Sequence, residues 1–328
     1  MVSSRATICL VLLFAGPANA GRHAAPSRPL PNATDAAFLH APHLLREANL
    51  GSPRFVDSAS PLPSIFTWWN ILDATMASAP SGQSGVFWQT GYVRELQIRR
   101  MVELAQRLPT ERSVHYCEIG MNGGHSAVSM LLAHPNLTAH VFDPLEYDYS
   151  APVVKLLTDS FQERFVITKG YSATTLPRFI LSMRAAGRRC DLVLIDGDHG
   201  FVGTSNDLKV LRKASGPHTA VVVDDVVPQC GEGLGGADEA DAAAYCKTYL
   251  AYKAGAKRQG RLDLRVHRPG AAVRKVASKG VIEVAERYGP YAMGTRENPC
   301  FRTRQGPRCG RPHEFDWGFV VARYLNTD

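Results

Sequence analysis

Two short apolar runs that each end in acidic residues constrain the fold of this chain more than any other feature. Residues 192–195 read Leu-Val-Leu-Ile and precede Asp196-Gly197-Asp198-His199, and residues 220–223 read Ala-Val-Val-Val and precede Asp224-Asp225. Short runs without polar alternation are typical of strands buried on both faces of a parallel sheet. Such sheets bind ligands at the carboxyl ends of their strands, so the acids and the histidine are expected to meet at a ligand-binding edge. Their side chains indicate metal-assisted chemistry.

The rest of the chain alternates between strand-like and helix-like segments. Further strands are predicted at residues 114–117, 139–142, 164–168, 280–286 and 318–324, and helices at residues 93–108, 127–133, 152–162 and 175–186. The last two strands are expected to form an antiparallel pair at the edge of the sheet. The pattern predicts an α/β fold, a doubly wound and mostly parallel sheet with this antiparallel edge pair and an N-terminal helical cap.

The two ends of the chain differ in composition from this middle part. Residues 1–20 place Arg5 ahead of an apolar run, which is typical of a secretory signal and predicts a secreted or lumenal protein. A transit-type leader to a plastid or other organelle is the alternative, because the first acidic residue is Asp35. Residues 21–64 are predicted to be an extended lead-in.

Residues 65–328 are expected to form one domain. Its helical cap covers residues 65–110, and its basic portion covers residues 251–311. This basic portion contains fifteen Lys and Arg but only four Asp and Glu. A solvated face explains this charge, and the alternative is a contact with an anionic surface or polyanionic glycan. No nucleic-acid partner is expected, because aromatic residues do not interleave with the basic ones.

Six cysteines follow residue 20, and an even number is compatible with disulfides in an oxidising compartment. The predicted disulfides are Cys230–Cys246 and Cys300–Cys309. Cys117 and Cys190 fall in or beside core strands and are expected to be buried thiols. Asn32 and Asn136 begin sequons, which favours a glycoprotein.

A glycine turn follows the first predicted strand and has the spacing E-x-G-x-x-x-G, from Glu118 through Gly120 to Gly124. Glycines let a ligand approach the backbone, and the following helix offers its free N–H groups. The spacing differs from the G-x-G-x-x-G of dinucleotide-binding turns. Asp143 ends the next strand, where a carboxylate commonly binds ribose hydroxyls. The turn and Asp143 predict a nucleoside-containing cofactor, and a plain turn beside a solvated aspartate is the alternative.

Together, residues 118–126, Asp143 and residues 170–172, 195–199 and 223–228 resemble a class I S-adenosylmethionine-dependent methyltransferase. Within that class, the chain is similar to the divalent-metal O-methyltransferases of the catechol type and of the macrocin-type sugar branch. The resemblance covers about residues 93–228. The cofactor contacts that it implies are Glu118, Gly120, Gly124, Ser126, Asp143, Ser172 and Asp196.

The same resemblance implies that Asp196, Asp224 and Asp225 bind a metal, with Mg²⁺ as the expected ion. Asp198 is expected to stabilise the turn instead. His199 stands where the catechol enzymes have a catalytic lysine and the macrocin type has a histidine base, which favours the sugar branch. Beside a cation, His199 is predicted to have a lowered pKa and to act as the base, and a surface histidine that caps the next helix is the alternative.

These observations predict an S-adenosylmethionine-dependent O-methyltransferase with Mg²⁺. Its acceptor would be a sugar-like or other small polyhydroxylated molecule or a glycan. One alternative is a nucleotide-dependent oxidoreductase, which the glycine spacing disfavours. The other is a non-catalytic lumenal protein that keeps the fold and binds a polyanion.

Overall fold

The computed structural model describes residues 60–80, 93–226, 268–291, 301–303, 306–308 and 317–325. The chain divides into two units, Met1–Ala37 and Phe38–Asp328, and all described residues belong to the second. Several predictions fall outside the described residues. They are the signal at 1–20, most of the lead-in, the Asn32 sequon, about half of the basic portion and the disulfides Cys230–Cys246 and Cys300–Cys309.

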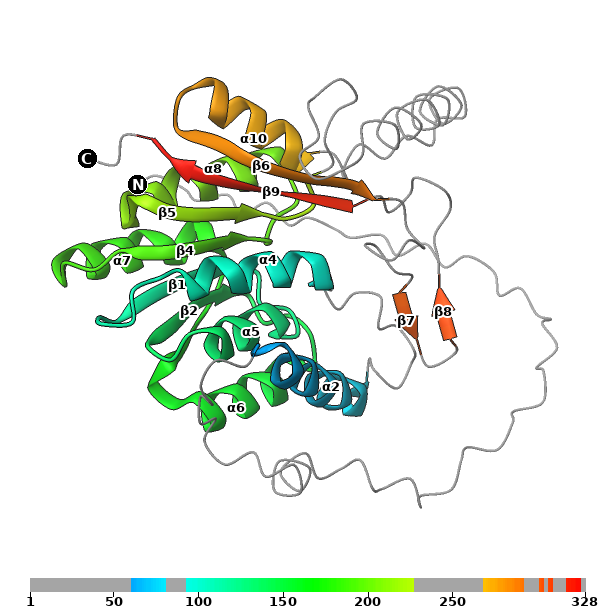
Figure 1. Ribbon diagram of the computed structural model, residues 1–328. Coiled ribbons are helices and arrows are strands. Elements are labelled where there is room, and N and C mark those ends of the chain that lie inside the picture. Colours follow the sequence, from blue (N-terminus) through cyan, green and yellow to red (C-terminus); the bar gives the residue numbers. More distant parts are fainter. Residues whose placement is uncertain are drawn as a thin grey trace, which may run out of the picture. The chain divides into compact units, whose positions relative to one another are not determined.

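The described residues form a seven-stranded sheet with the order β3-β2-β1-β4-β5-β9-β6 (Figure 1). Its strands are β1 (Val114–Ile119), β2 (Leu137–Asp143), β3 (Phe165–Lys169), β4 (Cys190–Ile195), β5 (Ser215–Val223), β6 (Ile282–Tyr291) and β9 (Trp317–Tyr324). Strands β1 to β5 run parallel, and β9 is antiparallel to both β5 and β6. The predicted fold class and the antiparallel edge pair are confirmed. A separate antiparallel pair consists of β7 (Phe301–Thr303) and β8 (Gly306–Arg308).

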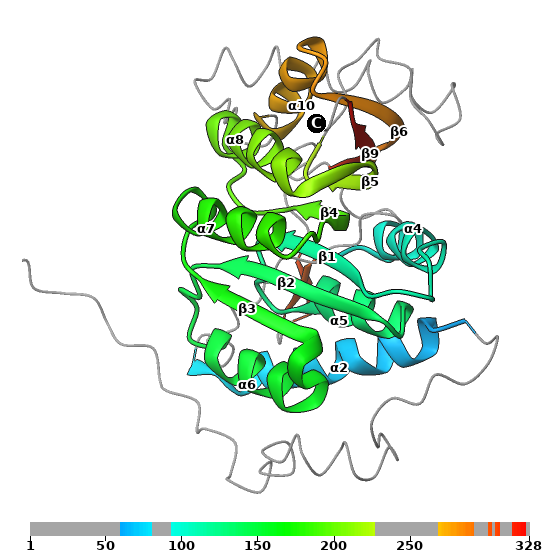
Figure 2. The ribbon, with the colours of Figure 1, turned by 90° about the vertical axis from the view of Figure 1, so that its left-hand side faces the viewer.

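Helices cover both faces of this sheet (Figure 2). One face carries α2 (Leu62–Ser78), α4 (Glu95–Gln106), α5 (His125–Ala133) and α6 (Ser150–Phe161), and the other carries α7 (Ser172–Ala185), α8 (Phe201–Leu211) and α10 (Arg268–Ser278), with 3₁₀ turns at Gln162–Arg164 and Arg212–Ala214. In β4, Leu192 and Leu194 pack in the first core layer, and Val193 and Ile195 pack in the second. Burial on both faces explains why this strand shows no polar alternation.

The helical cap packs against the sheet rather than standing apart from it. The Trp68 ring of α2 is 3% exposed and lies 5.2 Å from the Phe161 ring of α6. Arg100 of α4 pairs with Glu286 of β6, and this pair links the cap to the far edge of the sheet. Helix α2 begins at Leu62, within the last three residues of the predicted lead-in. None of the described helices is long and apolar enough to cross a membrane.

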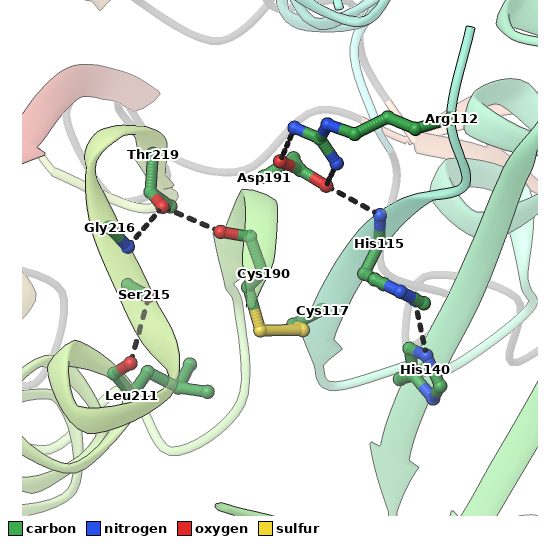
Figure 3. The surroundings of a disulfide bond; sticks show 10 residues. All are labelled: Arg112, His115, Cys117, His140, Cys190, Asp191, Leu211, Ser215, Gly216 and Thr219. Atoms are coloured by element: carbon green, nitrogen blue, oxygen red, sulfur yellow. Dashed lines mark hydrogen bonds and ion pairs between the residues drawn. A yellow bond between two sulfur atoms is a disulfide. The ribbon is translucent and has the colours of Figure 1, made fainter. Parts of the chain in front are cut away.

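The prediction of two buried thiols at Cys117 and Cys190 is wrong, because the structure joins these residues in a disulfide (Figure 3). Both residues are buried, and both belong to the core layer that packs under α7 and α8. Their Cα atoms lie 5.9 Å apart, which suits a disulfide. The pairing depends on β1 and β4 being neighbours. That neighbourhood is a property of the sheet topology, and no local pattern around either cysteine indicates it.

Candidate active site

The acidic residues reach the carboxyl edge of the sheet because the hydrogen-bond ladder continues beyond the strands. The Asp196 N–H donates to the Ile119 carbonyl at 2.9 Å, and the Asp224 N–H donates to the Ile195 carbonyl at 3.0 Å. Strands β4 and β5 are neighbours, with Ile195 opposite Val223. The two predicted acidic strand ends therefore emerge side by side, as expected.

Gly120 lies where the exit of β4 crosses the exit of β1. Its φ is +90°, and a Cβ at this position would lie 2.1 Å from the Asp196 carbonyl oxygen. Its N–H donates to the Phe142 carbonyl of β2 at 2.9 Å. Any other residue would force the two backbones apart, so Gly120 brings the cofactor turn and the acidic edge together.

Gly124 begins helix α5 with a left-handed φ of +77°. A Cβ here would lie 2.7 Å from the Leu157 Cδ1 of α6. The glycine therefore lets the start of α5 pack closely on α6. This requirement comes from the protein itself, and it holds in addition to the contact with the cofactor that the resemblance implies.

Asp143 fixes the conformation of the glycine turn. Its Oδ2 accepts the N–H groups of Met121 at 2.8 Å and Asn122 at 3.1 Å, and its Oδ1 accepts the Leu145 N–H at 2.6 Å. The residue is 8% exposed. A carboxylate offers about four acceptor positions, so capacity for a ribose hydroxyl remains. Asp143 thus has a structural task that the sequence pattern does not indicate.

Glu118 is a buried acid with one oxygen unused. Its Oε1 accepts the Ser126 hydroxyl, and its Oε2 has no hydrogen-bond partner among the described residues, although the nearby Tyr116 hydroxyl acts to lower the pKa of this acid. Burial raises the pKa of Glu118 to about 8. A buried polar atom without a partner is costly unless a ligand satisfies it. A cationic amino group would satisfy Oε2 and favour the ionised form, so this site fits the methionine end of S-adenosylmethionine.

Ser172 begins helix α7 and interacts with Asp207 of α8. Burial raises the pKa of Asp207 to about 6, and the Ser172 hydroxyl opposes that shift. The described partner of Ser172 is therefore a neighbouring helix. Its expected position near adenine stays a prediction.

Asp196, Asp225 and His199 form a compact cluster at the edge. One candidate ligand atom from each lies within 4.8 Å of the others. The His199 Nε2 lies 3.4 Å from the Asp196 Oδ1, and its Nδ1 lies 3.3 Å from the Asp225 Oδ2. Asp225 has a φ of 54°, an uncommon conformation that aspartate tolerates and that often occurs at functional sites. Two carboxylates and an imidazole in this geometry are a suitable donor set for a divalent cation.

The neighbouring carboxylates control the charge of His199. The hydrogen bond to Asp196 is the main cause that raises the pKa of His199 to about 10, with charge from Asp225 adding to it. This direction is opposite to the lowered pKa expected beside a cation. His199 is therefore charged near pH 7 with these neighbours. It can accept a proton only when positive charge compensates Asp196 and Asp225.

Asp224 lies beside this cluster and is more deeply buried than its three members. It is 4% exposed, and its Oδ1 accepts the Nε1–H of Trp317 at 2.7 Å. The Arg94 guanidinium lies over the Trp317 ring, 4.5 Å from its centroid. The compact cluster contains His199 with Asp196 and Asp225, and Asp224 lies close enough to interact electrostatically with both acids. The predicted metal role of Asp224 stays a prediction.

Trp317 and Arg94 are the residues at this edge that the sequence patterns do not reveal. Trp317 begins β9, 93 residues after Asp224, and Arg94 directly precedes α4. Their one sequence signal is an aromatic residue, Trp317, directly before the strand predicted at residues 318–324. The contact requires β9 to insert beside β5.

Asp198 stabilises the turn before helix α8. Its Oδ1 accepts the Gly200 N–H at 2.7 Å, and Gly200 is the N-cap of α8. The Thr204 hydroxyl donates to the Asp198 carbonyl at 2.9 Å. The prediction of a turn-stabilising carboxylate is confirmed.

A family model described as a methyltransferase domain matches residues 117–226, about one third of the chain. The matched segment contains the glycine turn, Asp143, Asp196, His199 and Asp225. No curated protein matches the chain.

Three similar solved structures are O-methyltransferases. A putative enzyme from Klebsiella pneumoniae has 15% identity over 87% of this chain and 96% of its own, with a TM-score of 0.44. The Bacillus cereus enzyme in complex with SAH has 12% identity over 86% and 96%, with a TM-score of 0.45. TomG from Streptomyces achromogenes, in complex with SAM, has 17% identity over 72% and 82%, with a TM-score of 0.44. These similarities are too weak to support a functional conclusion.

The matched domain and the predicted motifs coincide on the same strands and on the same edge of the sheet. A dinucleotide-dependent oxidoreductase does not agree with that match or with the glycine spacing. Residues 117–226 therefore match a methyltransferase domain, and this match agrees with the resemblance of the motifs to the S-adenosylmethionine-dependent class.

Proposed function

We propose that this protein transfers the methyl group of S-adenosylmethionine to a hydroxyl oxygen of a sugar-like or other small polyhydroxylated acceptor. The cluster of Asp196, His199 and Asp225 carries the proposal. Oxygen is a weak nucleophile until its proton is removed, and this cluster offers groups that can lower a hydroxyl pKa and accept its proton.

Cofactor binding in this proposal depends on the first two strands. The unused Glu118 Oε2 would take the amino group, and the carboxylate of Asp143 would bind ribose while it holds the glycine turn. Gly120 would keep the turn against Asp196, so that the methyl group and the acceptor oxygen meet across a short gap.

Asp196 and Asp225 would hold a divalent cation, with Mg²⁺ as the ion that carboxylate oxygens favour. The residues fit such an ion, because burial and the neighbouring Asp225 raise the pKa of Asp196, and positive charge would relieve that repulsion. When bound, the ion supplies a Lewis acid that lowers the pKa of the acceptor hydroxyl.

His199 is the proposed base. Its side chain is 53% exposed, so it can reach an acceptor that approaches from solvent. Once the charge of Asp196 and Asp225 is compensated, the pKa of His199 moves back toward its ordinary value, and the imidazole can take the hydroxyl proton.

The experiment is a methyl-transfer screen with labelled S-adenosylmethionine against free sugars, glycans and catechols, with Mg²⁺ and with EDTA. The proposal expects transfer to a sugar-like acceptor that EDTA abolishes and Mg²⁺ restores. If EDTA leaves the activity on a sugar unchanged, the metal has no role in the reaction. If methyl transfer occurs only to catechols, the proposed sugar-like acceptor is wrong.

The alternative of a non-catalytic protein that binds a polyanion is tested on the same sample. It predicts heparin retention at physiological salt and no binding of S-adenosylmethionine by calorimetry. Saturable cofactor binding would contradict it.

The proposal places the protein in the secretory pathway. Residues 1–20 have the pattern of a secretory signal, and the buried Cys117–Cys190 disulfide favours an oxidising compartment. When the full sequence is expressed, the protein is expected in the culture medium with residues 1–20 removed. Retention in the cytosol with free Cys117 and Cys190 would contradict it.

A further inference from the structure

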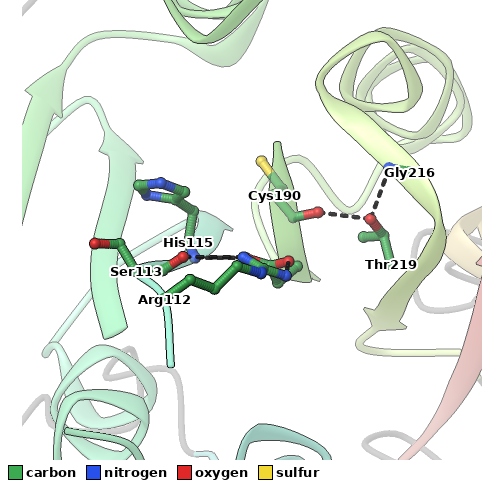
Figure 4. Close-up of polar contacts among 7 residues, drawn as sticks. Arg112, Ser113, His115, Cys190, Gly216 and Thr219 are labelled. Carbon is green, nitrogen blue, oxygen red and sulfur yellow. Dashed lines mark hydrogen bonds and ion pairs between the residues drawn. The ribbon is translucent and has the colours of Figure 1, made fainter. Parts of the chain in front are cut away.

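The amino edge of the sheet, opposite the candidate active site, contains a pocket of about 490 Å³. It lies between the amino ends of β1, β4 and β5, where the residues before and at the start of each strand line it (Figure 4). Its charged and titratable residues are Arg112, His115, Arg188, Arg189, Asp191 and His218. A volume of roughly 300–1,000 Å³ is typical of small-molecule sites.

Asp191 is the carboxylate among the lining residues, and its oxygens are already engaged. Arg112 binds it in a bidentate manner, with Nη1 3.1 Å from Oδ2 and Nη2 2.6 Å from Oδ1 (Figure 3). The backbone N–H of His115 donates to Oδ2 at 2.9 Å. Asp191 is therefore already paired with Arg112, and among the described residues it forms no ion pair with Arg188 or Arg189.

Arg188 and Arg189 supply positive charge that no acidic residue in the described part of the chain pairs with. The Arg189 side chain extends across the start of β5, since a Cβ on Gly216 would lie 3.4 Å from its Nη1. Three arginines and one aspartate leave the pocket lining with net positive charge.

Two histidines beside the pocket respond to this positive charge. Burial is the main cause that lowers the pKa of His115. The charge of Asp191 opposes this shift, and the charges of Arg188 and Arg112 add to it. Burial also lowers the pKa of His140 to about 4, and the charges of His115 and Arg188 add to that shift. The charge of Arg188 therefore acts on both histidines.

The walls of the pocket are held in place by the protein itself. The Thr219 hydroxyl accepts the Gly216 N–H at 2.8 Å and donates to the Cys190 carbonyl at 2.5 Å (Figure 4). Cys190 is also bound to Cys117 through the disulfide. A preorganised wall lowers the entropy cost of binding a ligand.

We propose that this pocket binds the phosphate or sulfate group of a small ester. Guanidinium groups match the geometry of tetrahedral oxyanions, and two of them at Arg188 and Arg189 lack an acidic partner in the described chain. The volume leaves room for the organic part of the ester beside the anion.

The test is calorimetric titration of the full protein with glucose 6-phosphate, glucose 6-sulfate and inorganic phosphate at low salt, with glucose as the uncharged control. The proposal expects saturable binding of both esters and none of glucose. Tighter binding of an ester than of inorganic phosphate identifies the ester as the ligand, and equal affinity identifies the free anion as sufficient. Absence of saturable binding for all three anions would overturn the proposal.

The matched variants are Arg188→Gln with Arg189→Gln, and Arg184→Gln as the control. Arg184 is exposed at the end of α7 and does not line the pocket. The double variant is expected to bind the ester about a hundredfold more weakly, because it loses two charged hydrogen bonds that each contribute about tenfold. Arg184→Gln is expected to bind as the wild type does, and both variants should bind S-adenosylmethionine normally. Wild-type affinity in the double variant would refute the site, and each single variant serves if the double variant melts early.

Discussion

The two edges of the same sheet differ in how their acidic residues are paired. At the carboxyl edge, Asp196, Asp224 and Asp225 are crowded, and burial with mutual repulsion raises the pKa of Asp196 and Asp224. At the amino edge, Asp191 is satisfied by Arg112 and by the His115 backbone. Charge that the fold leaves uncompensated marks a place where a ligand supplies the missing partner.

The edges also differ in how covalent and backbone structure support them. A disulfide joins β1 to β4 near the amino edge, between Cys117 and Cys190. At the carboxyl edge the strands are held by single backbone hydrogen bonds beyond each strand end, and Asp225 adopts a left-handed conformation. The disulfide is expected to stabilise the amino edge. At the carboxyl edge, the left-handed Asp225 and the crowded acids are expected to cost stability, as is common at functional sites.

The largest effect is expected for Asp225→Asn. Methyl transfer should fall by about 10⁴-fold, which corresponds to about 5 kcal/mol of transition-state stabilisation. The melting temperature should change little, because the variant removes both the repulsion between Asp225 and Asp196 and the ion pair between Asp225 and His199, and the affinity for S-adenosylmethionine should not change. Radiolabel transfer, thermal melting and calorimetry measure the three quantities. Asp159→Asn, at an exposed position on α6, is the control, and an active Asp225→Asn enzyme would contradict the assignment.

Removal of the disulfide tests the opposite edge. The variant Cys117→Ala with Cys190→Ala should lose about 4 kcal/mol of unfolding free energy, since the bond links residues 73 positions apart. Guanidinium denaturation measures this loss, and cofactor affinity should be retained. Reduction of the wild type should lower its stability by a similar amount. A non-reducing peptide map without the Cys117–Cys190 pair would show that the bond does not form.

Glu118→Gln tests the buried acid of the cofactor site. The folded protein raises the pKa of Glu118 to about 8 from 4.5, so this residue stabilises the fold fully below pH 4.5, and the contribution is lost as pH rises toward 8. The wild type should lose about 1.4 kcal/mol more than the variant for each pH unit in this window. Denaturation at pH 5, 6, 7 and 8 measures the difference.

The same variant should bind S-adenosylmethionine about tenfold more weakly, because the cofactor ammonium would lose a charged partner. Saturating cofactor should also flatten the pH dependence of the wild type, since it favours the ionised form. Parallel stability curves for wild type and Glu118→Gln would contradict the role of this acid.

The smallest effect is expected for Trp317→Phe. This change removes the hydrogen bond to Asp224 and should cost about 1.5 kcal/mol of stability. The apparent affinity for Mg²⁺ should fall by up to about tenfold, while cofactor affinity stays the same, because Trp317 orients an acid beside the proposed metal site. Trp68→Phe, in a buried position on α2, is the control. An equal loss of Mg²⁺ affinity in both variants would assign Trp317 a packing role only.

Local pattern predicts those parts of the fold that depend on neighbouring residues. The runs at 192–195 and 220–223 become β4 and β5 because apolar residues without alternation must be buried on both faces. Asp198 caps the turn through residues two and six positions ahead, and such contacts are visible in the sequence. The placement of Asp196 at the carboxyl edge follows from the strand that precedes it.

Contacts between distant segments cannot be predicted from local sequence patterns. The Cys117–Cys190 disulfide requires β1 beside β4, and the Trp317 bond to Asp224 requires β9 between β5 and β6. A charge shift such as that of His199 depends on which carboxylates the turn brings within about 3.5 Å, and spacing alone does not define that distance.

The sequence by itself determined the alternating strands and helices, the glycine turn and the acids at two strand ends, because each depends on periodicity or on residues close in the chain. The tertiary structure alone decided that His199 groups with Asp196 and Asp225 while Asp224 turns to Trp317. It also decided that the arginines of two separate loops surround one pocket at the opposite edge. Both outcomes depend on strand order, which is set by the packing of the whole domain rather than by any single segment.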